Sequence, residues 1–103
     1  MPKGALAMLV LRVLRNGPLH GYAIAQRIHQ LSGQVLEADE GSLYPALQRM
    51  LLEGWVTAEW GISETKRRVR FYALTPDGRK QLRHELAEYE RVSTAIQGIL
   101  RTA

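Results

Sequence analysis

Two segments near the N-terminus place apolar residues at helical spacing. The first runs from Gly4 to Arg15 and stops at Asn16-Gly17-Pro18, a turn through which a helix does not continue. The second runs from about Gly21 to Ser32, and Gly33 ends it. The spacing predicts that the inner face of the second helix is made of Ile24, Ala25, Ile28 and Leu31.

A third helix is predicted after the polar stretch 34–40, within which Val35-Leu36 favour a short extended pair. The hydroxyl of Ser42 can cap this helix, Pro45 falls in its first turn, and Gly54 closes it. Apolar residues three and four apart predict a buried stripe along it, made of Leu43, Ala46, Leu47, Met50 and Leu51.

The period of the pattern then changes from that of a helix to that of a strand. Residues 55–60 and 68–74 are rich in β-branched and aromatic side chains. The polar stretch 61–67 joins them, so the sequence predicts a β-hairpin.

A last helix is predicted from Thr75, whose hydroxyl can cap it, with Pro76 at the first helical position. It can run to about Leu100. Its inner positions approximate the 3.5-residue repeat of helices that pair with other helices. These positions are Leu82, Leu86, Tyr89, Ser93, Ile96 and Leu100.

The predicted elements follow the order α-α-α-β-β-α, which is the order of a winged helix-turn-helix fold. The fold class is therefore mainly α with a small β-hairpin. The second and third helices form the helix-turn-helix and the hairpin forms the wing. At 103 residues, the chain has the length of one compact domain.

Positive charge is concentrated in one part of the chain. Residues 60–83 carry seven basic and two acidic side chains, a net charge of +5, whereas the whole chain is +4 and the remainder is therefore −1. Such a zone on an otherwise neutral body favours a polyanionic partner. Charge alone fits DNA, RNA or an anionic membrane surface.

The outward face of the third helix carries side chains that can hydrogen-bond to phosphates or to base edges, namely Ser42, Tyr44, Gln48 and Arg49. In a major groove, Arg49 can address guanine and Gln48 adenine, since each forms two hydrogen bonds with its base. For an isolated helix, an ordinary solvated face is the simpler interpretation. The position between a helix-turn and a basic hairpin favours double-stranded DNA instead.

The wing is the second candidate surface, through its cations Lys66, Arg67, Arg68 and Arg70. These side chains can follow a phosphate backbone or enter a minor groove, and phosphate contacts are favoured over base contacts. The alternative is a charged strand edge that prevents aggregation.

The apolar stripe of the last helix is too long for so small a domain to cover, particularly beyond Tyr89. Part of it can pack on the chain's own first helix, and pairing with a second copy would bury the rest. We therefore expect residues 1–74 to form a DNA-binding part and residues 75–103 a C-terminal dimerisation helix. The predicted homodimer interface comprises Leu6, Leu9, Leu86, Tyr89, Val92, Ser93, Ile96, Ile99 and Leu100.

The residue types of the chain do not support a catalytic function. The chain has no cysteine, and its three histidines, His20, His29 and His84, lack the spacing of a metal or acid-base motif. No phosphate-binding glycine loop is present. We expect no enzyme activity, catalytic residue, metal or cofactor.

The absence of a signal peptide and of a membrane span favours a cytoplasmic, nucleoid-associated protein.

Three short motifs resemble the PadR family of transcriptional regulators. They are Gly17-Pro18-Leu19-His20-Gly21-Tyr22, Gly41-Ser42-Leu43-Tyr44-Pro45-Ala46-Leu47 and Phe71-Tyr72-Ala73-Leu74-Thr75, and the likeness extends over nearly the whole chain. The resemblance implies a winged-helix repressor, in a short form that dimerises through one C-terminal helix and in some members releases DNA on binding a small molecule. It implies DNA contacts by the wing cations and by Tyr22, Ser42, Tyr44 and Pro45.

The sequence departs from the family pattern in three places. Leu51 stands where relatives usually have an acidic residue, and Thr65-Lys66-Arg67 replace a glycine-rich wing tip, which suggests a stiffer and more basic tip. Tyr89 stands where many relatives have a tryptophan, and an aromatic pair there can stack a small, flat aromatic effector, although core packing is the simpler role.

The function predicted from the sequence is that of a sequence-specific regulator, a repressor that binds a palindromic operator as a homodimer. The alternative is a winged-helix protein-interaction module that does not bind DNA specifically.

Overall fold

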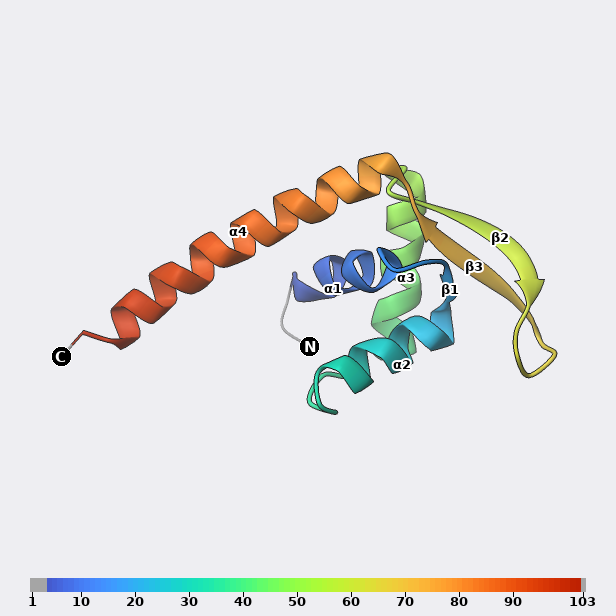
Figure 1. The fold of residues 1–103 in the computed structure, drawn as a ribbon, viewed down its shortest axis with the longest axis horizontal. Helices are drawn as coiled ribbons and strands as arrows, with labels where there is room; N and C mark the ends of the chain where they lie inside the picture. Colours follow the sequence, from blue (N-terminus) through green and yellow to red (C-terminus); the bar gives the residue numbers. More distant parts are fainter. Residues whose placement is uncertain (1–3, 103) are drawn as a thin grey trace.

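Seven segments of regular structure follow one another in the computed structural model, which describes residues 4–102 (Figure 1). The outer limits expected for the two parts of the chain, residues 1 and 103, lie outside this range. The predicted order of helices and wing is confirmed, and one short strand is added before the second helix. The elements are α1 (Ala5–Leu14), β1 (Leu19–His20), α2 (Gly21–Leu31), α3 (Glu40–Leu52), β2 (Val56–Ile62), β3 (Arg68–Leu74) and α4 (Pro76–Leu100).

The strands form an antiparallel sheet of three, in the order β1-β3-β2, and not the isolated hairpin that the sequence predicts. Leu19 pairs with Tyr72 and His20 with Phe71, so β1 ties the start of α2 to the wing. A strand of two residues is too short to show an alternating pattern, which is why the sequence does not reveal it. The expected extended pair Val35-Leu36 is not part of a strand.

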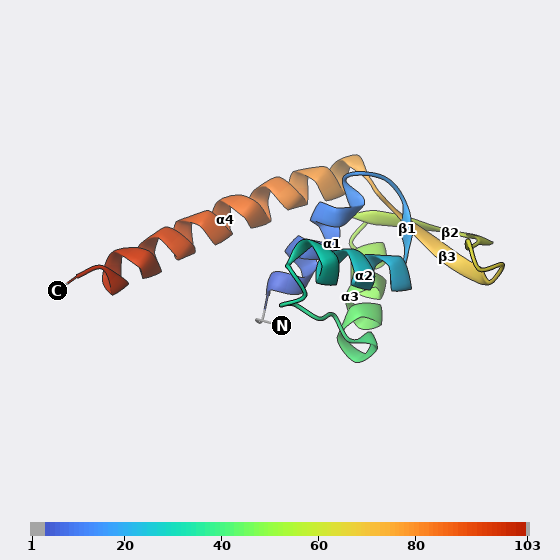
Figure 2. The ribbon, with the colours of Figure 1, turned by 60° about the horizontal axis from the view of Figure 1, so that its bottom comes forward.

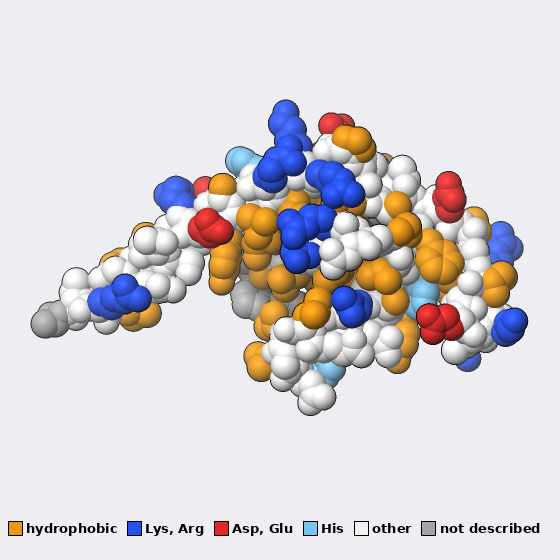
Figure 3. All heavy atoms as spheres, in the orientation of Figure 1, with side chains coloured by type: hydrophobic (Ala, Val, Ile, Leu, Met, Phe, Trp, Pro, Cys, Tyr) orange, Lys and Arg blue, Asp and Glu red, His pale blue; other side chains and the backbone are white. Residues whose placement is uncertain are grey.

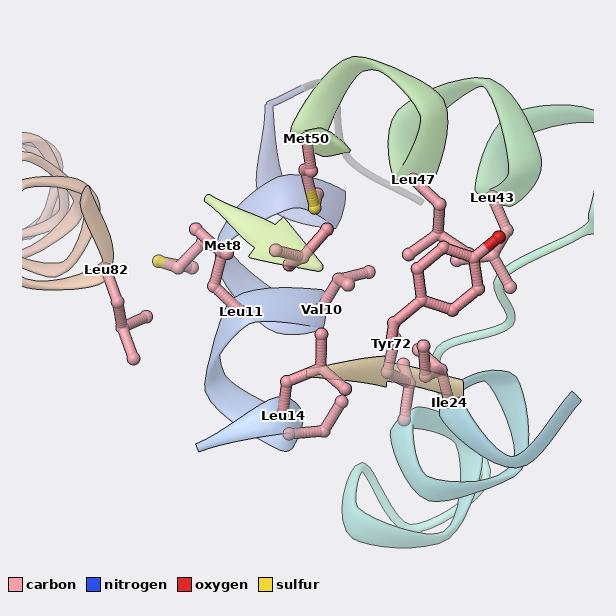
Figure 4. Packing of buried hydrophobic residues seen from close by; sticks show 13 residues of the cluster. Met8, Val10, Leu11, Leu14, Ile24, Leu43, Leu47, Met50, Tyr72 and Leu82 are labelled. Carbon is pink, nitrogen blue, oxygen red and sulfur yellow. The ribbon is translucent and has the colours of Figure 1, made fainter. Parts of the chain in front are cut away.

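The core lies where α1, α2 and α3 meet the sheet, and one residue of α4 completes it (Figure 4). Full burial of such a side chain contributes about 1.5–3 kcal/mol relative to its exposed state. The largest side chains with less than 2% of their surface exposed are Val10, Leu11, Leu14, Ile24, Leu43, Leu47, Met50 and Leu82. The stripe predicted for the third helix is confirmed. The prediction for Leu31 is wrong, since 65% of this residue is exposed beyond the edge of the core.

The start of α3 differs from the prediction. Asp39 is the N-cap, and its carboxylate accepts a hydrogen bond of 2.8 Å from the backbone N–H of Ser42. Asp and Ser are both favourable N-cap residues, and Asp39 is the cap here because the helix begins at Glu40. Pro45 therefore lies inside the helix and not in its first turn. It has no N–H to donate to the carbonyl of Gly41, an exposed residue.

The first turn of α4 is joined to the end of α3. As predicted, Thr75 is the N-cap, and its hydroxyl accepts from the N–H of Gly78 at 2.9 Å. The same hydroxyl donates to the carbonyl of Gly54 at 2.7 Å, and the Thr75 N–H donates to the carbonyl of Trp55 at 3.1 Å. Gly54 has a φ of +77°, which explains why a glycine closes α3.

Beyond Leu86, which still packs against the core, α4 leaves the body of the molecule and projects away from it (Figures 1 and 2). The helix has 25 residues, and the whole molecule measures 56 × 29 × 23 Å. Among residues 4–102, no helix combines the length and the apolar character needed to cross a membrane.

Candidate nucleic-acid interface

A hollow of about 410 Å³ lies between the helix-turn-helix and the wing. Tyr22 enters it from the start of α2, and Tyr44 and Gln48 enter it from α3. The strands β2 and β3 supply the facing side, with Trp60, Arg68 and Arg70 among its residues. We call this hollow the helix-wing groove. It brings together five of the residues that the sequence singles out.

Close packing against a glycine positions the Tyr44 side chain. A Cβ added to Gly21 would lie 2.9 Å from both Cε1 and Oη of Tyr44, so the ring rests directly on the first residue of α2. Tyr44 remains 46% exposed, and its neighbour Tyr22, which accepts a hydrogen bond of 3.4 Å from Gln26, is 65% exposed. Two partly exposed tyrosine rings therefore lie at the helical edge of the groove.

Aromatic rings hold the wing arginines in place. The guanidinium of Arg68 lies 4.6 Å from the centroid of the Trp60 ring. That of Arg70 lies 5.7 Å from Trp60 and 5.8 Å from Tyr72. Such cation-π contacts contribute about 0.5–2 kcal/mol each and leave the positive charge in place. The Nε of Arg70 is buried and has no hydrogen-bond partner among residues 4–102.

Trp60 is a site residue that the sequence analysis missed. It stands directly opposite Arg70 in the β2–β3 register, and Arg68 follows on the same face of β3. The sequence signal for Trp60 is an Arg-x-Arg alternation on one strand of a predicted hairpin with a tryptophan on the partner strand.

The tip of the wing is a tight turn held by Ser63. The Ser63 N–H donates to the carbonyl of Arg67 at 2.8 Å, and its hydroxyl accepts from the Arg67 N–H at 3.1 Å. Lys66 adopts a φ of +66°, a left-handed conformation that glycine adopts more readily than a residue with a Cβ. The side chains of Lys66 and Arg67 are exposed at this tip.

The remaining predicted contact residues of α3 lie outside the groove. Pro45 and Arg49 line a separate hollow of about 420 Å³ together with Trp55 and Glu85. Ser42 is exposed near the start of α3. Residues 48 and 49 are neighbours in sequence, but one helical step of 100° turns them to different sides of the helix. The structure therefore assigns Gln48, and not Arg49, to the groove.

The predicted dimer stripe is accessible along the projecting half of α4. Leu6 and Leu9 of α1, together with Leu86 and Ser93, are half-buried. The other members expose between 42% and 77% of their surface and are Tyr89, Val92, Ile96, Ile99 and Leu100.

An ion pair marks a polar side of α4. Arg91 donates two hydrogen bonds to the Glu88 carboxylate, from Nε at 3.1 Å and from Nη2 at 2.6 Å. These bonds and the opposite charge lower the pKa of Glu88 and raise the pKa of Arg91. Because both side chains are exposed, the pair contributes little to folding.

The fold and the groove define a winged helix-turn-helix protein. The sequence profile of the transcriptional regulator PadR-like family matches residues 10–84. The chain therefore belongs to the PadR-like family of transcriptional regulators, as its motifs suggest.

Individual relatives agree with this assignment. A transcriptional regulator from Clostridium thermocellum has a TM-score of 0.87 and 27% identity, over 96% of each chain. Bacillus subtilis PadR, crystallised in complex with operator DNA, has a TM-score of 0.71 and 32% identity, over 84% of this chain and 48% of that one.

Two curated relatives are longer proteins. The negative transcriptional regulator PadR of Bacillus subtilis is 29% identical over 92 residues, which are 89% of this chain and 50% of that protein. A 37.1 kDa protein in transposon Tn4556 of Streptomyces fradiae is 45% identical over 89 residues, which are 86% of this chain and 24% of that protein. The chain thus spans half or less of these two relatives.

Proposed function

We propose that this chain is a sequence-specific DNA-binding repressor that binds a palindromic operator as a homodimer. The observation that carries the proposal is the helix-wing groove, in which hydrogen-bonding side chains of α3 face two arginines whose guanidinium groups lie over aromatic rings. The operator complex of Bacillus subtilis PadR, at 32% identity, supports DNA as the partner.

In this proposal, α3 enters the major groove and the wing follows the neighbouring backbone or minor groove. Gln48 reads bases, because an amide can pair with both hydrogen-bonding groups of adenine. Tyr22 and Tyr44 offer hydroxyls to phosphates at the edge of the groove. Ser42, Pro45 and Arg49 flank the reading face and position the helix.

The homodimer provides the second half of the recognition surface. A two-fold pair of copies joined along α4 presents two α3 helices, and the palindrome of the operator mirrors this symmetry. The exposed apolar stripe on α4 supports the pairing. Bound across a promoter, such a dimer represses by excluding the polymerase. An aromatic effector stacked between two copies of Tyr89 is a further part of the proposal.

Sequence-specific DNA binding is tested with a fluorescent duplex from the region upstream of the gene that encodes this protein. We expect saturable binding in the anisotropy of this duplex, and competition by unlabelled upstream DNA at much lower concentration than by unrelated DNA. Equal competition by both DNAs would contradict sequence specificity.

Removing two wing charges should weaken binding to every DNA sequence alike. In the variant R67A/R68A, two phosphate contacts are lost from each subunit. The plot of log K against the logarithm of the salt concentration should therefore become less steep, by about 1.8 for each subunit bound. The matched control is K80A/R83A, which removes the same charge from α4. An unchanged slope in R67A/R68A, or an equal change in the control, would refute the role of the wing.

Filling the space above Gly21 should displace Tyr44 without unfolding the protein. The Cβ of G21A meets the end of a side chain that can rotate, so we expect about 1 kcal/mol of destabilisation and about tenfold weaker operator binding. A double-mutant cycle with Y44A provides the control, because G21A should cost no further affinity once the ring is absent. Additive losses would show that Gly21 acts independently of Tyr44.

A further inference from the structure

His20 lies at the point where the sheet, the helix α2 and the helix-wing groove meet. It is the last residue of β1 and the N-cap of α2, and it lines the groove. Its backbone pairs with Phe71 of β3, and its ring meets the Phe71 ring edge-on, with 5.6 Å between the centroids and an interplanar angle of 78°. Edge-to-face packing is a favourable arrangement of two aromatic rings. These contacts hold the imidazole beside the groove.

One nitrogen of the His20 ring is committed to the start of α2. Nδ1 accepts a hydrogen bond of 3.3 Å from the backbone N–H of Ala23, one of the first N–H groups of the helix, which have no carbonyl partner within it. Because a backbone N–H can only donate, Nδ1 carries no proton. The proton of a neutral imidazole then resides on the other nitrogen. The helix cap therefore makes Nε2 of His20 a hydrogen-bond donor.

This donor has no acceptor within the chain. Among residues 4–102, the side chain of His20 forms its hydrogen bond with Ala23 alone. The buried side-chain nitrogen or oxygen that lacks a partner in this range is Nε of Arg70, so Nε2 of the half-buried His20 is accessible to solvent. An accessible donor on a residue that lines the groove is available to a bound molecule.

The surroundings of His20 favour an anion as that molecule. Arg68 and Arg70 bring positive charge to the groove, and the part of the chain that the structure describes places no Asp or Glu in its lining. Lys and Arg side chains are also exposed at the free end of the wing (Figure 3). The imidazole Nε2 and the buried Nε of Arg70 are two donors without acceptors, which a phosphate with several oxygens can satisfy.

We propose that His20 donates its Nε2–H to an oxygen of one DNA phosphate, which lies in the helix-wing groove beside Arg70. This inference rests on the proposed function, because it requires DNA in that groove. His20 then has two tasks, since Nδ1 caps α2 while Nε2 binds the DNA backbone. Through the pairing of β1 with β3, the same residue ties the phosphate contact to the position of the wing.

Two substitutions separate the two nitrogens of His20. In H20N the short amide can take the place of Nδ1, and Asn is a favoured N-cap, but no group reaches the position of Nε2. In H20Q the longer amide can take the place of Nε2, but Gln is not among the favoured caps. We expect H20N to keep the urea midpoint of the wild type and to bind DNA about tenfold or more weakly. H20Q should have a lower urea midpoint and lose less affinity than H20N.

The affinities are measured by fluorescence anisotropy at one salt concentration, with the upstream duplex and with an unrelated duplex. A phosphate contact carries no sequence information, so H20N should weaken both by a similar factor. In a second arm, phosphates of the upstream duplex are replaced one at a time by neutral methylphosphonates. At the contacted phosphate, the replacement should cost the wild type more affinity than it costs H20N.

Three results would overturn the proposal. These are unchanged DNA affinity in H20N, losses of affinity in H20N and H20Q that follow their losses of stability, and methylphosphonate effects that are the same in H20N and wild type. The second result would leave His20 with the capping role alone. If the wild type binds neither duplex, the proposed function fails and this contact with it. If the wild type binds both duplexes equally, sequence specificity fails while the phosphate contact stands.

Discussion

Replacing Gly78 with alanine is expected to lower the free energy of unfolding by about 3 kcal/mol, the largest loss of stability that we predict. The added Cβ would overlap the carbonyl oxygen of Trp55 and lie 2.7 Å from Cδ1 of Leu74. The carbonyl cannot move aside freely, because it accepts the hydrogen bond from the N–H of Thr75. The overlap therefore forces α4 away from the turn that joins α3 to the wing.

Gly98 provides the matched control on the same helix. A Cβ added at Gly98 meets no atom within 4 Å, so G98A should stabilise α4 by up to about 1 kcal/mol. Urea unfolding at one fixed protein concentration compares the two variants, since the stability of a dimer depends on concentration. Equal midpoints for G78A and G98A would contradict the close contact at Gly78.

A charge at Ile96 is expected to separate the proposed homodimer and with it abolish tight operator binding. Ile96 lies in the middle of the accessible stripe and is 52% exposed in the single chain. In I96E each subunit would bury an unpaired carboxylate, which costs several kcal/mol in total and weakens dimerisation by about 100-fold or more. A monomer presents one α3 helix, so operator affinity falls together with the dimer.

The control T94E places the same charge on the opposite side of α4. Thr94 is two residues from Ile96, a rotation of about 200° around the helix, and it is exposed. Sedimentation velocity should find T94E dimeric and I96E monomeric at micromolar concentration. An I96E protein that stays dimeric, or that binds the operator as a monomer with unchanged affinity, would refute pairing through this stripe.

Much of the fold could be predicted because the local signals agree with each other. At the start of α4, the cap Thr75 and the proline at position 76 specify the same helix end that the tertiary packing uses. At the start of α3 the signals compete, since Asp39 and Ser42 are both good caps three residues apart. The strand β1 has two residues, and its pairing with β3 depends on contacts distant in sequence.

The candidate interface could be predicted by region but not by side chain. Charge located the wing, and the position after a helix and turn located α3. The choice between Gln48 and Arg49 depends on how α3 is rotated in the core, which a local pattern does not fix. The rings that hold Arg68 and Arg70 come from strand register, and the contact of Tyr44 with Gly21 comes from the packing of two helices.

Selection of bound DNA from randomised duplexes, at one defined salt concentration, tests the central proposal most directly. We predict enrichment of an inverted repeat whose half-sites are separated by about 10 base pairs, one helical turn, or a multiple of it. The variant Q48A should select the same repeat with relaxed preference at one position in each half. No enrichment would favour a protein-interaction module, and a single asymmetric site would contradict binding by a symmetric homodimer.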